Sequence, residues 1–387
     1  MDFSAGFAFT CPFKTNSGNR ALEHLPVELS GLNAFKPLII TSLDLVGSKA
    51  IRTLTDAFGD SGMTMGVFDG IMDIADLSII EQLKNIFIKG QYDSIIALGG
   101  GVVVDVAKVV NLAVSLKVAD ASQLSGETAI RGPLGPFVVV PTSAVTGLET
   151  SKYAFVNRMP FVSIHLMPNL VIIDTRMIRT EGERAIADAG LAAFSRALEA
   201  YIAPDRNPFM DAYVFAALRF IRENLITAVK NPHDKKASLA IANAAAMSGC
   251  AISNTGQGVL HRLGLVFHDM VNVHPGMIMG MCLIPVITDY LNKDSHLVST
   301  LLHPLTGDDE YAATPETRRA EATLSDLRRF LNELYGILED RRIRRTIKDV
   351  GISKYMMDDI LEVLGREPDG AYLRTVIERV WDRPVKA

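Results

Sequence analysis

The spacing of hydrophobic residues changes near residue 180, and this change constrains the fold more than any other feature of the chain. Before it, short β-branched runs alternate with stretches of helical periodicity such as Val46–Phe58 and Asp76–Lys89. The expected strands are Pro37–Thr41, Met65–Phe68, Ser94–Leu98, Phe137–Val140 and Leu170–Ile173. Because alternating strands and helices form βαβ units, residues 1–180 are predicted to form an α/β domain with a Rossmann-like parallel sheet.

After residue 180 the hydrophobic residues recur with the period of long helices and almost no strand signal remains. The expected helices include Glu183–Ile202, Phe209–Val229, Lys235–Ser253 and Pro315–Leu338. Residues 181–387 are therefore predicted to form an all-helical domain. We expect the active-site cleft of such a chain to lie between its two domains.

Charge and composition exclude several classes of protein. The formal net charge is −5, which gives no electrostatic reason to expect a nucleic-acid partner. The longest apolar runs, such as Met277–Ile287, fall short of the roughly 20 residues that span a bilayer. The basic stretch Arg341–Arg345 is interpreted as a solvated helix face. No signal peptide is visible, and Cys11, Cys250 and Cys282 form no CxxC pair, so a cytoplasmic protein with reduced thiols is expected.

A glycine turn follows the strand expected at Ser94–Leu98. Gly99, Gly100 and Gly101 lead into a helix that begins near Val102. Glycines let the backbone approach a phosphate, and the free N–H groups of the helix start stabilise its negative charge. The spacing is not G-x-G-x-x-G, so a tight strand-to-helix turn without a ligand is the alternative.

A second loop, Pro141–Ser151, follows another buried strand and is rich in small hydroxyl residues. Hydroxyl and N–H groups at the carboxyl end of a strand suit a nucleotide's phosphate, ribose or amide. The alternative is that these hydroxyls only cap helices.

Together these segments resemble the iron-containing (group III) alcohol dehydrogenases, which have the dehydroquinate synthase-like fold. The resemblance covers most of residues 35–290. The matching motifs, in the order of the family, are F-D-G at Phe68–Gly70, D-x-I-I-A-x-G-G-G at Asp93–Gly101, D-x-A-K at Asp105–Lys108, P-T-T-A-G-T-G-S-E at Pro141–Glu149, P-x-x-x-x-x-D at Pro168–Asp174 and S-N-x-x-x-G-x-x-H at Ser253–His261.

The resemblance implies an NAD(P) cofactor and assigns residues to it. It places Gly99, Gly100, Gly101 and Val102 along the pyrophosphate, Asp105 as a support of the cofactor, and Thr142, Thr146 and Gly147 beside its adenosine or nicotinamide. The family often has an Asp after the first strand that contacts the ribose, where this chain has Ser42. A neutral residue there removes repulsion of a 2′-phosphate, so NADP is expected to be tolerated or preferred. The alternative is that Ser42 is only a loop residue.

The resemblance also implies a metal site, from which this chain departs. The family holds Fe²⁺ or Zn²⁺ with one Asp and three His, and the matching positions here are Ala192, Arg196, His261 and Pro275. The family's P-H-G is exchanged to His274-Pro275-Gly276. Ala has no lone pair and Arg is not deprotonated in proteins, so a family-type metal ion is not expected. A rearranged set of His261, His268 and His274 is the alternative.

The chain is therefore predicted to be an NAD(P)-dependent oxidoreductase for a small alcohol and its aldehyde or ketone, without a catalytic metal. Arg196 would be the electrophile, and His261 or His274 the proton donor. Alternatively, Arg196 pairs with Asp188 or Glu199 in an inert nucleotide-binding homologue with a structural or regulatory role. A third reading is a metal-dependent alcohol dehydrogenase with rearranged ligands. Relatives of this kind commonly form dimers or larger assemblies, so a homo-oligomer, specifically a dimer, is expected. The short apolar runs give no reason to expect a membrane partner.

Overall fold

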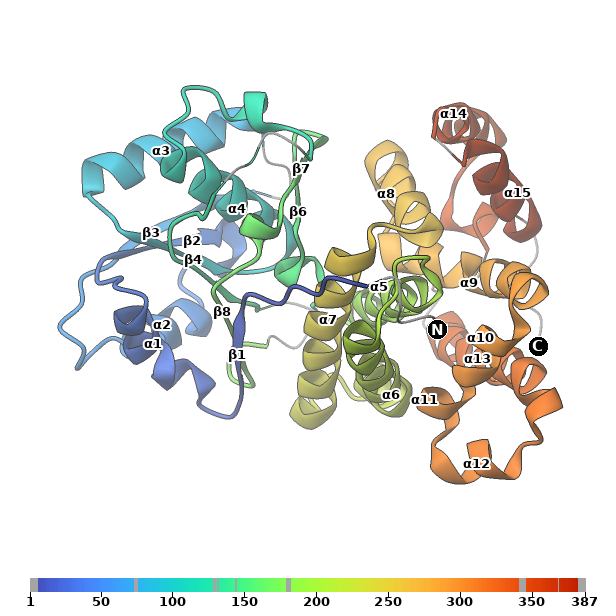
Figure 1. Ribbon diagram of the computed structural model, residues 1–387. Coiled ribbons are helices and arrows are strands. Elements are labelled where there is room, and N and C mark those ends of the chain that lie inside the picture. The colour runs from blue at the N-terminus through green and yellow to red at the C-terminus, as the bar shows by residue number, and fades with distance from the viewer. Residues whose placement is uncertain are drawn as a thin grey trace. The chain divides into compact units, whose positions relative to one another are not determined.

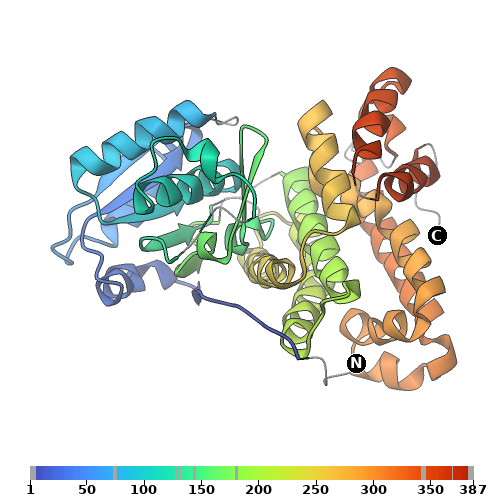
Figure 2. The same ribbon diagram turned by 45° about the horizontal axis from the view of Figure 1, so that its top comes forward.

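A computed structural model of the chain describes residues 6–72, 76–127, 130, 132–142, 145–178, 182–340, 346–367 and 369–381 (Figures 1 and 2). The basic stretch at 341–345 lies outside these residues. The chain divides into two compact units, residues 10–180 and residues 181–387, and residues 6–9 belong to the second. No helix in the described ranges is both long and apolar enough to cross a membrane.

The first unit is built on a parallel sheet of six strands in the order β1-β8-β5-β4-β2-β3 (Figure 1). These strands are β1 (Lys14–Gly18), β2 (Pro37–Ser42), β3 (Gly66–Ile71), β4 (Ser94–Leu98), β5 (Phe137–Val140) and β8 (Leu170–Asp174). The five predicted strands and the parallel sheet are confirmed. The sequence did not reveal β1, because it is a polar strand at the edge of the sheet.

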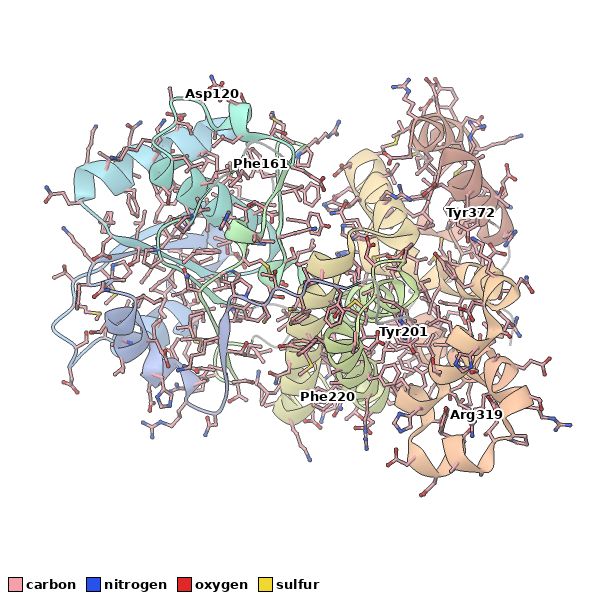
Figure 3. The ribbon with its side chains drawn as sticks, in the orientation of Figure 1. Asp120, Phe161, Tyr201, Phe220, Arg319 and Tyr372 are labelled. Carbon is pink, nitrogen blue, oxygen red and sulfur yellow. The ribbon has the colours of Figure 1, made fainter. Side chains whose placement is uncertain are left out.

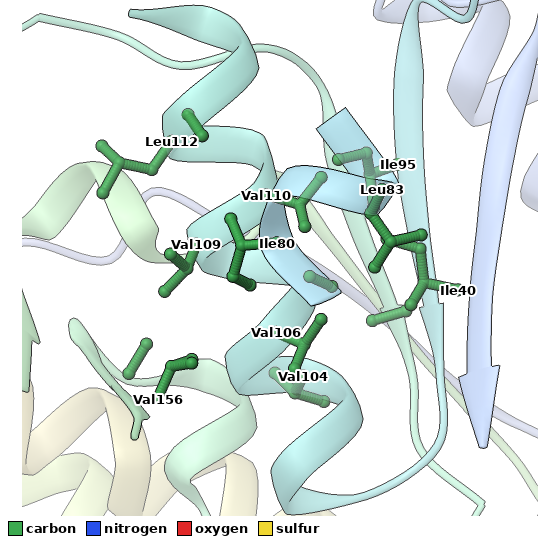
Figure 4. Packing of buried hydrophobic residues seen from close by; sticks show 14 of the residues in the cluster. Ile40, Ile80, Leu83, Ile95, Val104, Val106, Val109, Val110, Leu112 and Val156 are labelled. Carbon is green, nitrogen blue, oxygen red and sulfur yellow. The ribbon is translucent and has the colours of Figure 1, made fainter. Parts of the chain in front are cut away.

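Helices cover both faces of this sheet, so its central strands are apolar throughout. On β2, Ile39 packs with helices α1 (Leu25–Gly31) and α2 (Lys49–Asp56), whereas Leu38 and Ile40 pack with the opposite layer. That layer consists of helices α3 (Leu77–Gly90) and α4 (Gly101–Ser115). Figure 4 shows this second layer, in which Ile40, Ile80, Leu83, Ile95, Val106 and Val110 pack together.

A small antiparallel hairpin, β6 (Tyr153–Val156) and β7 (Met159–Val162), lies beside α4. Its turn is made by Asn157 and Arg158, which both have positive φ. The sequence analysis missed the hairpin because Asn-Arg is not one of the glycine-containing turns that signal one.

The strand order reverses between β2 and β4. From β2 the chain runs outward to β3, and from β4 it continues in the opposite direction to β5. In the register of this pair, Thr41 lies opposite Leu98. In open parallel sheets, ligands bind outside the carboxyl ends of the strands at such a reversal.

The second unit is helical, as predicted. Its helices are α5 (Glu183–Ile202), α6 (Pro208–Lys230), α7 (Lys235–Thr255), α8 (Val259–Val271), α9 (Pro275–Lys293), α10 (Ser295–Thr300), α11 (Leu302–Thr306), α12 (Asp308–Ala313), α13 (Glu316–Asp340), α14 (Lys354–Gly365) and α15 (Gly370–Val380). Helix α5 is its centre, since every residue from Ile186 to Ile202 is buried. It packs against α6, α7, α8 and α9.

Residues 6–9 pack with the helical unit rather than with the parallel sheet. The ring of Phe9 lies 5.8 Å from that of Phe209 and 5.5 Å from that of Tyr213, and the ring of Phe7 lies 5.9 Å from that of Phe209. Phe209 and Tyr213 belong to α6, so these aromatic contacts attach the N-terminal segment to the helical unit.

An ion pair and a hydrogen bond to a carboxylate join the outer helices of this unit. Arg222 of α6 binds the buried Asp326 of α13 through two hydrogen bonds, at 2.9 and 3.1 Å. Tyr372 on α15, labelled in Figure 3, donates a hydrogen bond of 2.9 Å to Asp289 on α9. The second contact holds α15 to α9, whose first turn approaches α5.

The approach of α9 to α5 requires Gly276. A Cβ atom at this position would overlap the backbone carbonyl of Asp188 and press on the backbone nitrogen of Ala192. We expect Gly276→Ala to lower the free energy of unfolding by about 3 kcal/mol, because the obstacle is backbone rather than a movable side chain.

Gly336 in α13 is the matched control, since a Cβ there meets nothing within 4 Å. Gly336→Ala should leave stability unchanged or raise it by about 0.5–1 kcal/mol. Chemical denaturation of both variants measures the difference, and equal stabilities would contradict the close approach at Gly276.

Candidate active site

The glycine turn at the end of β4 leaves the start of α4 open. Gly99 has φ +157°, and a Cβ there would meet the side chain of Val103. Gly100 is the N-cap of α4 and offers no side chain to its first N–H groups. A Cβ at Gly101 would meet only open space, and Val102 is half-buried. An open helix start without a side-chain cap leaves N–H groups and a positive dipole end for an anion.

Ser42 ends β2, the strand beside this turn, and its hydroxyl is hydrogen-bonded to the carboxylate of Asp44. The short 3-10 helix η3 (Leu43–Leu45) turns the chain so that Asp44 lies close to Ser42. We expected a neutral strand end at Ser42. Ser42 itself is neutral, but Asp44 adds a carboxylate beside it, and the expected tolerance of NADP stays a prediction.

Asp105 and Lys108, predicted from the D-x-A-K motif, take part in a buried ionic cluster. The Lys108 ammonium group donates to the carbonyl oxygens of Leu148, Ser151 and Tyr153 at 2.7–2.8 Å. Burial lowers the pKa of Lys108 to about 8 and raises that of Asp105 to about 7, although the two charges attract each other. The cluster joins α4 to the end of the hydroxyl-rich loop and to the start of β6.

Within that loop, Glu149 takes up two of the N–H groups that we expected to face the cofactor. Its carboxylate accepts hydrogen bonds from the backbone of Thr146 at 3.2 Å and of Gly147 at 2.7 Å. Gly147 has φ +98°, which favours glycine. Thr142 is buried directly after β5. Any role of Thr146 toward a nucleotide therefore falls to its side chain rather than to its N–H group.

The second set of predicted residues lies on α5. Asp188, Ala192, Arg196 and Glu199 are spaced three or four residues apart, so they share one face of the helix. All four are buried. This face meets the first turns of α8 and α9, which contain His261 and Pro275.

Arg196 and His261 are in direct contact. The Arg196 Nε–H group donates to His261 Nδ1 at 3.2 Å, and each residue is only 2% exposed. Burial, together with the charges of Arg196 and Arg262, holds the pKa of His261 well below its usual range. The imidazole is therefore neutral, and because Nδ1 accepts, its proton is on Nε2. Within the described residues, His261 Nε2 is buried and has no hydrogen-bond partner.

The two carboxylates of the α5 face cap neighbouring helices. Glu199 accepts hydrogen bonds from the backbone N–H groups of Leu260 and His261, and a Cβ at the N-cap residue Gly258 would overlap its carboxylate. Asp188 accepts from the N–H group of Met277 at 2.9 Å. The sequence analysis named both only as partners for Arg196. Their capping roles have no local sequence signal, because the helices they cap lie about 60 to 90 residues away.

Burial raises the pKa of both carboxyl groups, in the case of Glu199 to about 7, while the charge of Arg196 opposes the rise. The positive charge of Arg196 thus acts on both groups.

The remaining predicted residues are not gathered around His261. The His274 side chain is half-exposed, and its Nδ1 atom lies 3.9 Å from Asp188 Oδ2. His268 is exposed near the end of α8. Pro275 is the first residue of α9. Among the residues that the structure describes, no three His, Cys, Asp or Glu side chains are close enough to hold a metal ion. With a methyl group, a guanidinium and a proline ring at three ligand positions, these residues do not fit the metal that the resemblance implies.

The raised pKa of Glu199 predicts a dependence of stability on pH. Between its ordinary pKa of 4.5 and about 7, the folded chain keeps a proton that the unfolded chain releases. This contribution to stability is therefore lost as pH rises through that window, at about 1.4 kcal/mol per unit of pKa difference. Glu199→Gln removes the titration, so the loss of thermal stability from pH 5 to 7.5 should be smaller in the variant than in the parent. Equal slopes in calorimetry would contradict this assignment.

Comparisons with known proteins agree with these observations. The sequence profile of the iron-containing alcohol dehydrogenases matches residues 12–175, and the C-terminal profile of the same family matches residues 186–363. The chain is 28% identical over 262 residues to the NAD-dependent methanol dehydrogenase of Bacillus methanolicus, covering 66% of this chain and 68% of that protein. It is 25% identical to long-chain-alcohol dehydrogenase 1 of Geobacillus thermodenitrificans over 90% of this chain and 88% of that one.

Among solved structures, a 1,3-propanediol oxidoreductase superposes with a TM-score of 0.86 at 20% identity, covering 97% of this chain and all of that one. The fold is thus shared even where few residues are. The two profile matches together extend over most of the chain, and both describe one family of alcohol dehydrogenase-type oxidoreductases. The chain belongs to the iron-containing alcohol dehydrogenase family.

Proposed function

We propose that this chain is an NAD(P)(H)-dependent oxidoreductase that interconverts a small alcohol and its aldehyde or ketone without a catalytic metal ion. The observation that supports the proposal most strongly is the buried hydrogen bond from Arg196 to His261. It joins two of the positions that match metal ligands in the family. The Arg196 cation and the neutral N–H donor of His261 occupy positions that match ligands of the family's metal ion, which would act as a Lewis acid.

The glycine turn supports the cofactor half of the proposal. The N–H groups at the start of α4 lack a side-chain cap and would bind the pyrophosphate. The name of the methanol dehydrogenase relative, which is NAD-dependent, supports the choice of a nicotinamide. When bound, the nicotinamide supplies or accepts the hydride.

Arg196 and His261 then act on the substrate oxygen. As a hydride adds to the carbonyl carbon, the π electron pair moves to the oxygen, which becomes negative. The permanent charge of Arg196 stabilises this oxygen, and the His261 Nε2–H group donates a hydrogen bond to it. Burial strengthens both interactions, because little water competes for them.

The proton that completes the alcohol has a different source. Because the pKa of His261 is far below its usual range, His261 holds no second proton to give at neutral pH. We assign proton exchange with solvent to His274, which is half-exposed and faces Asp188. In the oxidative direction the same route removes the proton.

Replacing Arg196 tests the mechanism. Arg196→Met should lower kcat by about 100- to 1,000-fold, the usual cost of losing one oxyanion donor, while NADH binding stays unchanged. Arg196→Lys keeps a cation but loses the planar Nε–H group, so it should recover only part of the rate. Arg184→Met is the control, because Arg184 is exposed at the start of the same helix. Full activity of Arg196→Met would refute the role of this residue.

Removal of metal gives an independent test. Dialysis against EDTA should leave kcat within about twofold of the untreated protein, and added Fe²⁺ or Zn²⁺ should not raise it, because the described residues offer no set of three ligands. Activity that disappears with the chelator and returns with one of these ions would instead support a rearranged metal site.

A further inference from the structure

The helical unit contains a pocket none of whose residues is assigned to coenzyme or substrate. It lies where the carboxyl end of α5 meets α6, α10, α11 and α12 (Figure 1). Its volume is about 340 Å³, within the range of about 300–1,000 Å³ that is usual for small-molecule sites. We call it the aromatic pocket, because most of the side chains that line it carry rings. The lining residues are Tyr201, Phe215, Thr300, His303, Asp308 and Tyr311.

The rings of the aromatic pocket follow one another around its wall. The centroid of the Phe215 ring lies 5.2 Å from that of Tyr201 and 6.2 Å from that of His303. The His303 ring in turn lies 5.2 Å from that of Tyr311. Successive rings are inclined by 42°, 53° and 67°, so they form a curved wall rather than a flat stack. Thr300 fixes the first ring, since its hydroxyl oxygen lies 2.6 Å from that of Tyr201.

Two of these rings already bind cations. The guanidinium of Arg206 lies 4.2 Å from the centroid of the Tyr201 ring, and that of Arg319 lies 4.0 Å from the centroid of the Tyr311 ring. Tyr201 and Arg319 are labelled in Figure 3. Neither arginine is among the described residues that line the pocket. The ring faces here therefore attract positive charge, and the sides that face the pocket are not taken up by these arginines.

A carboxylate also lines the pocket. The Asp308 side chain is 81% exposed, and its Oδ1 atom lies 2.6 Å from Nε2 of His303. Because a carboxylate only accepts hydrogen bonds, the imidazole is the donor in this contact. His303 thus holds Asp308 beside the rings while the carboxylate stays accessible from solvent.

The arginines beside the pocket do not cancel this negative charge. Arg206 is paired with the carboxylate of Asp211 at 2.9 Å. The first turn of α12 contains two further exposed carboxylates, Asp309 and Glu310, in addition to the one that lines the pocket. This turn therefore carries more negative charge than Arg319 carries positive charge. The electrostatic balance around the pocket favours a cation.

We infer that the aromatic pocket binds a small organic cation of the methylated ammonium class. Ring faces attract such an ion, and its methyl groups make apolar contacts with the same rings. The nearby carboxylate attracts it further, repels an anion and gives no advantage to a neutral apolar molecule. The inference is independent of the proposed function, because it involves neither the coenzyme nor the pair of Arg196 and His261.

Calorimetric titration of the full-length protein with tetramethylammonium chloride tests the inference, with tert-butanol as an uncharged probe of similar size. The parent should bind tetramethylammonium with a Kd of about 1 mM or lower, and tert-butanol at least about tenfold more weakly. Equal binding of the two probes would show that charge plays no part and would overturn the inference. The absence of saturable binding of tetramethylammonium below about 20 mM would do the same.

Substitutions locate the binding. Phe215→Leu keeps an apolar side chain but removes one ring, and should raise the Kd about fivefold or more. Asp308→Asn removes a charge that solvent partly screens, and should raise the Kd about threefold. The matched controls are Phe220→Leu on the same helix, at a residue labelled in Figure 3, and Asp309→Asn in the same turn. Neither control residue is among those that line the pocket, so each should change the Kd by less than about twofold.

The two pocket variants separate loss of binding from loss of folding. Asp308 is exposed, so weaker binding in Asp308→Asn cannot result from a disrupted core. An unchanged Kd in both pocket variants, or an equal rise in the controls, overturns the inference. Binding of NADH, measured in the same samples, tests the proposed function separately.

Discussion

The burial of Arg196 in the centre of α5 is the constraint on which the helical unit depends. A guanidinium cannot be neutralised in a protein, so its environment has to stabilise the charge. His261 accepts its Nε–H group, and its charge lowers the pKa of both Asp188 and Glu199 against the effect of burial. These carboxylates also bind the N–H groups at the starts of α8 and α9. One face of α5 thereby holds Arg196 and His261 in place together with the starts of α8 and α9.

In the first unit, charged side chains also bind backbone groups, but there they hold a loop rather than helix starts. Lys108 binds three carbonyl oxygens, and Glu149 binds two N–H groups of the loop before them. These contacts connect the glycine turn, through α4, to the hydroxyl-rich loop. Residues that look like ligand contacts in a sequence motif thus hold the glycine turn and the hydroxyl-rich loop in position. A buried lysine is suited to this work, since its three donors can bind three separate carbonyl groups.

Much of the fold could be predicted from the sequence, because burial on both sheet faces leaves apolar runs and helices leave a period of 3.6 residues. The helix predicted at Glu183–Ile202 has the observed bounds. The polar edge strand β1 and the β6–β7 hairpin lacked these signals. At the site, the family resemblance indicated Arg196 and His261, but not their direct contact. The bond between Ser42 and Asp44 was also hidden, since it depends on how η3 turns the chain rather than on residue type.

The positions that match the family's metal ligands also bear on how such a chain can evolve. Restoring four ligands would require changes at Ala192, Arg196 and Pro275, and each change alone adds a single ligand to His261. Replacing Arg196 first would remove the cation that now stabilises two buried carboxylates, and so would disturb two helix starts before any ion was bound. A chain with only some of these changes loses the present arrangement without gaining a complete set of ligands. Replacing the buried arginine therefore costs the helical unit an internal charge that its neighbours depend on, whether or not the replacement is a metal ligand.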